Sequence, residues 1–392
     1  MLDLGLTPLA NSLLATADGP VAPRYPLTLL WCSHCSLVQL GQIVAPRRLF
    51  SDYVYYSSYS DTMLQHAKTL ADALISSEGL TRESMVIEIA SNDGYLLQYF
   101  VARGIPVLGI EPAQNIAAEA QARGIPTLPA FFDEATGIQI GNSSPADVVI
   151  GNNVLAHVPD LNGFVAGVAK SLKRTGVAVF EFPYLANMLS DVEFDTIYHE
   201  HQCYFSLTAL KRLFEEHGLE PVSAERIPIH GGSLRVTFAH QRQRHPRPNV
   251  TELLVAEAEM GVQAPAMYQV FRNRVLELKE QLVDLIEAFK RQDMRIAGYG
   301  AAAKGVTLTS FCGIGKQHID YLVDRSPHKQ GHFFPVGPLE IFHPNTLLED
   351  HPETTLLLTW NFADEILEQQ KQYTSTGGKF IIPVPLPRLA TR

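Results

Sequence analysis

The sequence predicts an α/β protein in which two nucleotide-binding units follow a small N-terminal segment. Residues 84–182 and residues 294–383 each combine apolar strand-like runs with glycine-containing turns and helices that follow them, as in sheets that bind nucleotides at the carboxyl ends of their strands. A Cys-x-x-Cys pair within the first 60 residues marks a separate small unit. We therefore expect three domains, over residues 1–60, 61–245 and 246–392.

The composition is that of an ordinary globular protein. Hydrophobic residues make up 46% of the chain and charged residues 18%, which supports large buried cores. The net charge of −10 is not offset by a basic block, which argues against a nucleic-acid partner. No apolar stretch approaches the ~20 residues that span a bilayer, and no basic segment follows Met1 as in a signal peptide. We expect a cytoplasmic protein with no membrane partner, as a monomer or weak oligomer.

The N-terminal unit contains half of a zinc-binding pattern. Residues 26–31 are strand-like and lead into Cys32 and Cys35, which resemble one half of a zinc ribbon. A structural zinc ion needs four ligands and the sequence has no second pair, although His34 and His66 are conceivable additional ligands. The simpler alternative is a small turn that contains two thiols.

A run of aromatic residues precedes the first nucleotide-binding unit. Residues 50–60 include Tyr53 and Tyr55 among several tyrosines. These rings either line a cleft or cap a core, and composition alone favours the core. Residues 61–79 have apolar side chains at helical spacing and predict an amphipathic helix.

The first unit has a turn that suits a cationic ligand. Residues 85–90 form an apolar strand, and the turn that follows it contains Gly94, the geometry of a nucleotide site at a helix N-terminus. The turn is not Gly-x-Gly-x-x-Gly, and Glu88 and Asp93 put negative charge where the pyrophosphate of a dinucleotide lies. S-adenosylmethionine fits this environment, because its amino group and its sulfonium are positive.

Later strand ends complete this predicted site. Glu111 follows the strand over residues 107–110 and can accept hydrogen bonds from ribose hydroxyls; the alternative is a role near a helix N-terminus. The strand over residues 147–150 leads to His157, which the same rule places at the cleft. The predicted cofactor-binding residues are Glu88, Ala90, Asn92, Asp93, Gly94, Glu111, Pro112, Asn152 and Asn153.

The stretch of residues 194–206 lies between the two units and is rich in proton-handling groups. Four consecutive polar side chains, from Tyr198 to His201, are flanked by aromatic and apolar residues. This pattern suits the wall of a reactive cleft. A metal cluster or a buried polar network is the alternative, and we expect one of the two histidines, His199 or His201, to point away from the cleft.

The second unit predicts a diphosphate site. Residues 295–305 resemble a dinucleotide fingerprint with alanine in the third place, and Lys304 adds a positive charge suited to a diphosphate. Asp324 ends the next strand, where a ribose or a base can be bound. The predicted substrate-binding residues are Tyr299, Gly300, Ala301, Ala302, Lys304, Asp324 and Lys329. Upstream, the glycine pair after His230 permits a close backbone approach to a ligand or makes a turn.

These residues together resemble the bacterial nucleotide-sugar C-methyltransferases, which make branched deoxysugars for antibiotics and cell surfaces. The resemblance runs from Leu2 to about Pro383. Its most specific pieces are residues 4–11, 52–60, 89–94, 198–201, 230–235 and 298–305.

The resemblance implies a zinc-ribbon-like N-terminal domain, a central class I S-adenosylmethionine methyltransferase domain with a Rossmann-like fold, and a second Rossmann-like C-terminal domain that holds a nucleoside diphosphate. The active site is expected between the last two. The family typically has two Cys-x-x-Cys pairs for zinc, of which this sequence has only Cys32 and Cys35. Residues 334–339 also depart from the pattern of relatives, near the expected sugar nucleotide.

The resemblance also implies a reaction: methyl transfer to C3 of a nucleoside-diphosphate 4-keto-deoxysugar, with a dTDP-sugar as the expected substrate. A base removes the acidic C3 hydrogen to give an enolate, and histidine is suited to this by its unperturbed pKa of about 6.5. His201 is the expected base, and any zinc is structural. The remaining catalytic candidates, expected to position the sugar, stabilise the enolate or orient a histidine, are Tyr198, Glu200, His157, Tyr53, Tyr55 and His230.

Three other functions fit parts of the pattern. An NAD-dependent sugar-nucleotide oxidoreductase would use the C-terminal unit, but the acidic first turn and the missing third glycine count against it. A non-catalytic sugar-nucleotide binder or zinc-ribbon adaptor would tolerate loss of His201. An O- or N-methyltransferase on the same scaffold differs only in the substrate atom that is methylated.

Overall fold

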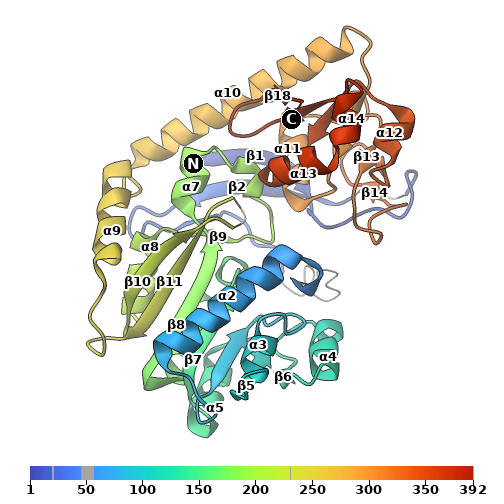
Figure 1. Ribbon diagram of the computed structural model, residues 1–392. Coiled ribbons are helices and arrows are strands. Elements are labelled where there is room, and N and C mark those ends of the chain that lie inside the picture. The colour runs from blue at the N-terminus through green and yellow to red at the C-terminus, as the bar shows by residue number, and fades with distance from the viewer. Residues whose placement is uncertain (20–21, 46–56, 230, 392) are drawn as a thin grey trace.

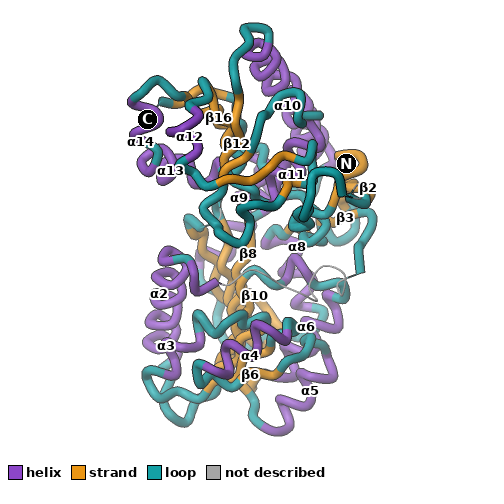
Figure 2. Tube along the Cα trace, turned by 90° about the vertical axis from the view of Figure 1, so that its right-hand side faces the viewer, coloured by secondary structure: helices purple, strands orange, loops and turns teal. Residues whose placement is uncertain are grey.

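The computed structural model describes residues 1–19, 22–45, 57–229 and 231–391 of the protein. Within these residues, the chain forms three sheets that lie in succession along the molecule, with the N-terminal sheet between the two larger ones (Figure 1). The tube in Figure 2 shows helices on both sides of the larger sheets. In the described part of the chain, no helix is both long enough and apolar enough to cross a bilayer.

The N-terminal sheet is completed by a strand from the middle of the chain. The described strands have the order β1-β2-β3-β9 and pair antiparallel. Leu27 and Leu29 of the second strand are fully buried at period-2 spacing. β9 comes from the polar stretch 194–206, so this stretch is fixed to the N-terminal unit. The strands are β1 (Leu2–Pro8), β2 (Arg24–Trp31), β3 (Val38–Leu40) and β9 (Cys203–Tyr204).

The central sheet is mostly parallel and has the described order β10-β11-β8-β7-β4-β5-β6. β4, which contains Glu88, is buried along its whole length, as a parallel strand covered on both faces should be. The strands are β4 (Val86–Ile89), β5 (Val107–Ile110), β6 (Thr127–Leu128), β7 (Ala146–Asn152), β8 (Leu172–Pro183), β10 (Leu219–Ile227) and β11 (Ser233–His240). The last two pair antiparallel, and β11 also pairs antiparallel with β8.

Different helices cover the two faces of this sheet. One face packs against α2 (Asp61–Glu78) and α3 (Leu97–Val101), and α2 lies along β8 in Figure 1. Ser60 caps the N-terminus of α2 with its side chain, and Gly79 ends this helix in the left-handed conformation. The other helices of this unit are α4 (Gln114–Ala122), α5 (Glu134–Ser143), α6 (Leu161–Ser171), α7 (Leu185–Ser190) and α8 (Leu207–Glu215).

A two-helix connection leads to the C-terminal sheet. α9 (Pro248–Met260) is followed by the long α10 (Pro265–Lys290), which spans the top of the molecule in Figure 1. The C-terminal sheet has the described order β14-β15-β13-β12-β16-β17-β18. Its elements are β12 (Ile296–Tyr299), α11 (Ala303–Cys312), β13 (Leu322–Val323), β14 (Phe333–Phe334), β15 (Leu339–Phe342), α12 (Thr346–Asp350), β16 (Thr354–Leu357), α13 (Ala363–Gln369), α14 (Lys371–Ser375), β17 (Lys379–Ile382) and β18 (Arg388–Ala390).

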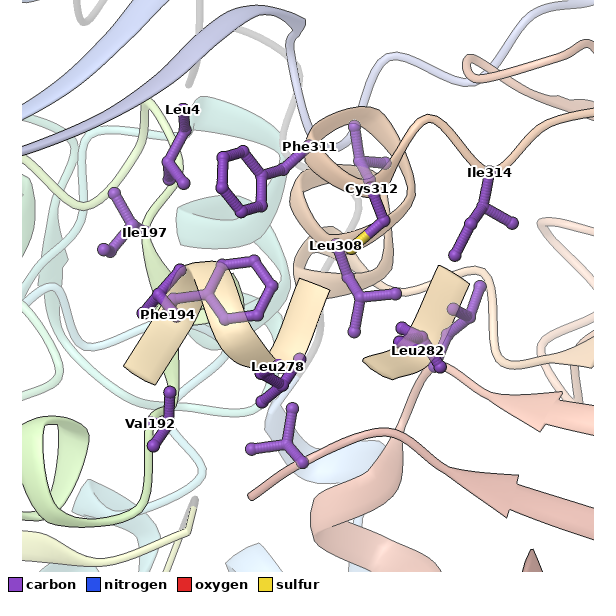
Figure 3. Close-up of a cluster of buried hydrophobic side chains, with 14 of the residues drawn as sticks. Leu4, Val192, Phe194, Ile197, Leu278, Leu282, Leu308, Phe311, Cys312 and Ile314 are labelled. Carbon is purple, nitrogen blue, oxygen red and sulfur yellow. The ribbon is translucent and has the colours of Figure 1, made fainter. Parts of the chain in front are cut away.

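One hydrophobic core joins the N-terminal sheet, the stretch 194–206 and the C-terminal unit. Phe194 faces Phe311 of α11, with ring centroids 5.4 Å apart, and Leu278 of α10 lies in the same cluster (Figure 3). Thr307 of α11 also donates its hydroxyl hydrogen to the carbonyl of Ile197 at 2.8 Å. The polar stretch is therefore packed between two units rather than exposed as a loop.

Candidate active site

The predicted cofactor turn begins at a fully buried carboxyl group. Glu88 lies in β4, and neither of its side-chain oxygens has a partner among the described residues. Burial raises the pKa of Glu88 well above its ordinary value, and the charges of Glu111 and Asp93 add to the effect. A carboxyl group in this state is ready to accept hydrogen bonds from a cationic ligand.

The turn after β4 needs a special backbone. Asn92 and Gly94 both have positive φ angles, and a β-carbon added at Gly94 would lie 2.2 Å from the Cδ1 atom of Ile125. The Asn92 amide donates to a Glu111 oxygen at 3.0 Å, and the Ala113 amide donates to the other Glu111 oxygen at 2.9 Å. Glu111 thus fixes the turn. Each carboxylate oxygen still has a second lone pair, so the predicted ribose contact remains open to it.

Asp93 differs from the expectation that its charge faces the ligand. The side chain is fully buried and its Oδ2 atom is 3.2 Å from Nη1 of Arg123, which comes from the end of α4. The hydroxyl of Ser58 donates to the same oxygen. The Oδ2 atom of Asp93 is therefore paired within the protein, whereas its Oδ1 atom and both side-chain oxygens of Glu88 are buried without a partner among the described residues.

Two asparagines end β7 beside Glu88. The side-chain amide of Asn152 donates to the hydroxyl of Tyr95 at 3.4 Å, and its Oδ1 atom is buried with no partner in the described part of the chain. Asn153 has a φ of 53° and its amide donates to the Glu181 carbonyl at 2.7 Å. Because β4 and β7 pair in parallel, these residues and Glu88 lie toward the same edge of the sheet.

These residues fit S-adenosylmethionine. Glu88 and Asn152 contribute three buried oxygens without donors among the described residues, and the ammonium of the methionine end has three hydrogens to donate. Glu111 is placed at the end of the adjacent strand, where ribose hydroxyls are read. The residues of this set, named the donor site below, are Glu88, Ala90, Asn92, Gly94, Glu111, Pro112, Asn152 and Asn153.

Tyr198 and His201 form a hydrogen-bonded pair. The Tyr198 hydroxyl lies 2.8 Å from Nε2 of His201, and Nδ1 of His201 lies 3.2 Å from the carbonyl oxygen of Thr196. Because a carbonyl only accepts, the His201 proton sits on Nδ1 and the lone pair of Nε2 accepts the Tyr198 hydrogen. This is the arrangement of a histidine base that is oriented by its second nitrogen.

His157 is a neutral neighbour of this pair. Its ring centroid is 5.1 Å from that of His201, and its Nδ1 atom donates to the carbonyl of Glu200 at 2.7 Å. Burial lowers the pKa of His157 to about 4, although the Glu200 carbonyl partly opposes this. At neutral pH its Nε2 atom can therefore only accept hydrogen bonds.

The other two residues of the run from Tyr198 to His201, which are His199 and Glu200, contact the N-terminal unit. Glu200 accepts a hydrogen bond from the Asn11 side chain at 2.7 Å, and burial raises its pKa to about 7. His199 is buried, with Nε2 at 3.2 Å from the carbonyl of Pro26 and its ring against Tyr25. His199 therefore packs against the N-terminal sheet, whereas His201 pairs with Tyr198 and lies beside His157.

Three catalytic candidates lie outside the described residues: Tyr53, Tyr55 and His230. The residues that follow Tyr53 and Tyr55 in the described part of the chain are hydrogen-bonded to the turn after β4. Ser57 donates its amide hydrogen to Oδ1 of Asn92 at 2.9 Å, and Ser58 binds Asp93.

The C-terminal unit holds a second strand-turn-helix site. Gly300 has a φ of 93°, and a β-carbon there would meet the Thr359 hydroxyl at 2.6 Å. Asp324 accepts the Ala301 amide hydrogen at 2.8 Å, and Lys329 donates to the Ala301 carbonyl at 2.9 Å. The structure thus brings together the predicted set Gly300, Ala301, Ala302, Asp324 and Lys329.

Tyr299, which was predicted to bind the substrate, has a buried side chain in the C-terminal unit. Its side chain is 3% exposed and packs against Phe380, with ring centroids 6.2 Å apart. It belongs to the core on one face of the C-terminal sheet. The alternation of β12 directs it inward, while the open backbone begins one residue later at Gly300.

Lys304 was expected at a diphosphate and instead faces the stretch 194–206. Its Nζ atom lies 4.3 Å from the ring centroid of Trp360, and its positive charge acts on Glu193 and Asp195. Trp360 donates its indole hydrogen to Asp195 at 2.7 Å. We name the cluster of Glu193, Asp195, Lys304 and Trp360 the acidic latch. Only Lys304 was predicted from the sequence as a site residue, because the cluster joins segments that are far apart along the chain.

The two cysteines do not complete a metal site within the described residues. Cys32 and Cys35 lie in a tight turn, where the Ser36 amide donates to the Cys32 carbonyl at 2.9 Å. No cluster of three or more potential metal ligands occurs in the described ranges. Backbone hydrogen bonds from Cys35 and His34 lower the pKa of the Cys32 thiol, and His66 binds Glu181 instead of the cysteines. A complete zinc site therefore does not fit the residues described.

Known families and one known protein resemble this chain along nearly its whole length. Family models match at residues 1–50 (zinc binding domain), 63–224 ("Methyltransferase domain") and 228–385 ("C-methyltransferase C-terminal domain"). The C-methyltransferase NovU of Streptomyces niveus is 36% identical over 392 residues, covering 99% of this chain and 93% of NovU.

Solved structures resemble about half of the chain. The magnesium protoporphyrin IX methyltransferase ChlM of Synechocystis PCC 6803, with bound SAM, is 14% identical with a TM-score of 0.36, covering 50% of this chain and 89% of its own. The PH0226 protein of Pyrococcus horikoshii OT3 is 15% identical with a TM-score of 0.38, covering 50% and 98%.

Proposed function

Because this chain belongs to the family of S-adenosylmethionine-dependent C-methyltransferases, we propose that its substrate is a nucleoside-diphosphate 4-keto-deoxysugar, methylated at C3. The family favours C-methylation over the NAD-dependent oxidoreductase and the O- or N-methyltransferase alternatives. The observation that carries the proposal is the Tyr198–His201 pair, whose geometry leaves His201 Nε2 as the proton acceptor. A carbon nucleophile requires such a base, because a C–H bond must be broken first.

The donor site holds the cofactor, which supplies an electrophilic methyl group when bound. Glu88 and Asn152 offer buried oxygens to its ammonium end. Glu111 lies at the next strand end, within reach of a ribose. The turn at Gly94 lets the backbone pass close to the ligand.

The C-terminal unit and the stretch 194–206 hold the sugar nucleotide. The open backbone at Gly300 and the cation of Lys329 suit a diphosphate, which leaves the sugar toward His201. The substrate ketone at C4 makes the hydrogens on its neighbouring carbons acidic. His201 removes one of them, directly or through the Tyr198 hydroxyl, and the electron pair of the C–H bond moves onto the ketone oxygen.

The resulting enolate carbon would form the new C–C bond while the bond between the methyl group and the sulfonium sulfur breaks, so that the ketone forms again and S-adenosylhomocysteine is the leaving group. The proton then resides on Nε2 of His201 and is released to water in a later step. His157 contributes a neutral acceptor next to this proton, since its low pKa keeps it uncharged at neutral pH. A second positive charge beside His201 would disfavour its protonation, so a neutral neighbour helps it to act as a base.

Proton exchange tests this proposal without requiring methyl transfer. The protein is incubated in D₂O with S-adenosylhomocysteine and a dTDP-4-keto-6-deoxyhexose, and deuterium is located by NMR. We expect enzyme-dependent exchange at C3 that is lost in H201N. Exchange at C5 would move the reaction to the other carbon beside the ketone, and no exchange at either carbon would contradict the proposal.

Calorimetric titration tests the two ligand sites. We expect S-adenosylhomocysteine and dTDP to bind at separate sites, each in the presence of the other. Binding of the first alone would keep the methyltransferase and remove the sugar-nucleotide assignment.

A further inference from the structure

A row of polar side chains crosses the α2-covered face of the central sheet. Side chains alternate along strands, and Val86, Val148, Ile150, Val177 and Val179 all belong to the core beneath α2. By the same alternation, Glu88 of β4, Asn152 of β7 and Glu181 of β8 point to this face. The row lies near the carboxyl ends of these strands, so it is continuous with the donor site.

Glu181 is the charged centre of this row. It is 2% exposed, and its Oε1 atom lies 2.6 Å from Nε of Arg235 on β11, the neighbouring strand. Its Oε2 atom lies 2.6 Å from Nε2 of His66 on α2. Burial alone would raise the pKa of Glu181, but the His66 hydrogen bond and the Arg235 charge outweigh burial and lower it. Glu181 is therefore an anion between two basic side chains.

Helix packing alone does not require this pair. α2 is already fixed by apolar contacts of Met63, Ala67, Leu70 and Leu74, and a buried ion pair adds little net stability compared with apolar residues. The carboxylate instead orients the imidazole, in the way that a second group orients a binding histidine. The His66 side chain keeps 16% of its surface exposed, so it is not sealed in the core.

The methionine end of the cofactor carries two opposite charges. Glu88 and Asn152 have buried oxygens suited to its ammonium, but these groups cannot bind its carboxylate. A carboxylate needs a donor, and one with a positive charge binds it most strongly. On this row, Arg235 and His66 are the basic side chains, and Arg235 is turned to Glu181 through its Nε atom.

We propose that His66, oriented by Glu181 and Arg235, binds the α-carboxylate of the methyl donor. The inference rests on the donor site proposed above. In this arrangement His66 donates one ring hydrogen through Nε2 to Glu181, and it donates the other, on Nδ1, to the carboxylate of the ligand. His66 is thus a binding residue, whereas Glu181 and Arg235 are positioning residues.

The binding of three ligands distinguishes a carboxylate-binding role of His66 from a purely structural role. S-adenosylhomocysteine has both the ammonium and the carboxylate, its decarboxylated analogue keeps only the ammonium, and 5′-methylthioadenosine has neither. Calorimetry is done on the full-length wild type, H66Q and K68A. Glutamine keeps a donor toward Glu181 without a charge, and Lys68 is an exposed cation on the same helix, so K68A controls for the loss of one positive charge.

We expect H66Q to weaken S-adenosylhomocysteine binding about 10- to 100-fold, as for loss of a charge-assisted hydrogen bond. Its binding of the other two ligands should change less than about 2-fold, and K68A should resemble the wild type throughout. Equal weakening of all three ligands would assign His66 to the support of α2, and an unchanged H66Q would also overturn the proposal.

Two further comparisons keep the test decisive. If H66Q does not fold by circular dichroism, the wild type alone must bind S-adenosylhomocysteine about 10- to 100-fold more tightly than its decarboxylated analogue, and equal binding would overturn the proposal. E181Q should show a smaller loss that again needs the ligand carboxylate. A wild type that binds no S-adenosylhomocysteine would instead refute the donor site itself.

Discussion

At the scale of single residues, the second nitrogen of His201 determines what the first can do. The Thr196 carbonyl holds the proton on Nδ1, so the lone pair of Nε2 accepts the Tyr198 hydrogen. His199, two positions earlier, has the same chemistry but lies buried against the N-terminal sheet. Residue type alone does not distinguish the two; the contacts of each ring do.

The first prediction concerns this base. H201N should lower the methyl-transfer rate about 10²- to 10⁴-fold, the usual loss for a general base. Y198F should lower it by a smaller factor, because the histidine loses only its hydroxyl partner. Rates are measured by product formation, and S-adenosylhomocysteine affinity should stay unchanged in both variants. H217N, outside the site, is the control; an H201N enzyme as fast as H217N would exclude His201 as the base.

A second prediction concerns the acidic latch and pH. Burial raises the pKa of Glu193 to about 8, and Lys304 opposes this only in part. Because the folded pKa exceeds the unfolded value, Glu193 contributes stability below pH ~4.5 that is lost as the pH rises through about 8. The melting temperature should therefore fall between pH 5 and pH 8.5, and it should fall less in E193Q, by at least about 2 °C.

The control for this effect is E252Q on the exposed side of α9. Differential scanning fluorimetry across the pH range compares the three proteins. If E193Q and the wild type lose stability in parallel, Glu193 is ionised in the folded protein at neutral pH and the interpretation fails.

At the scale of elements, the turn after β4 determines the donor site. It needs left-handed backbone at Asn92 and Gly94, and it lies against Ile125 with no room for a β-carbon at Gly94. Glu111 fixes this turn from the next strand. This hydrogen bond links the turn after β4 to the end of β5.

The third prediction uses two glycines with the same backbone conformation. Gly94 and Gly124 have φ angles of 79° and 80°, but an added β-carbon at Gly124 meets nothing within 4 Å. Both alanine variants carry a similar backbone strain, of about 1 kcal/mol, and only G94A also displaces Ile125. G94A should bind S-adenosylhomocysteine about 10-fold more weakly or worse, and G124A should bind normally. Equal affinities by calorimetry would contradict this account of the turn.

At the scale of the whole molecule, the stretch 194–206 joins the N-terminal unit to the C-terminal unit. β9 pairs with the N-terminal sheet, Asn11 holds Glu200, and Phe194 packs on Phe311 of α11. The Trp360–Asp195 hydrogen bond adds a further link to the C-terminal unit. The position of His201 therefore depends on both neighbouring units.

The fourth prediction tests this connection. F311A removes a ring that is 9% exposed and should destabilise the protein by about 3–5 kcal/mol. It should also lower the methyl-transfer rate by more than it weakens S-adenosylhomocysteine binding, because Phe311 packs on Phe194 of the stretch that carries His201. F362A removes an exposed ring of the same unit and should change neither. Denaturant unfolding and steady-state kinetics compare the two, and equal stability of both variants would sink the prediction.

Several features of the protein follow from the sequence alone. The strands of the donor site are predicted by the apolar run 85–90, by the glycine turn after it and by Glu111 at the end of the next strand. Such strand and turn patterns depend on neighbouring residues, so they are visible in the sequence. The same reasoning predicts the second strand-turn-helix unit at Gly300. The family also follows from the sequence, since its motifs lie along the whole chain.

Only the tertiary structure decided how the polar side chains pair. Asn11 and Glu200 are 189 positions apart, and Trp360 and Asp195 are 165 apart. Lys304 faces carboxylates from another unit rather than a diphosphate, and His66 binds Glu181 rather than the cysteines. Such contacts depend on how whole units pack, which local periodicity does not encode. The sequence by itself therefore determined the strands, the turns and the polar residues at the strand ends, and the packing of three sheets determined which side chains face one another.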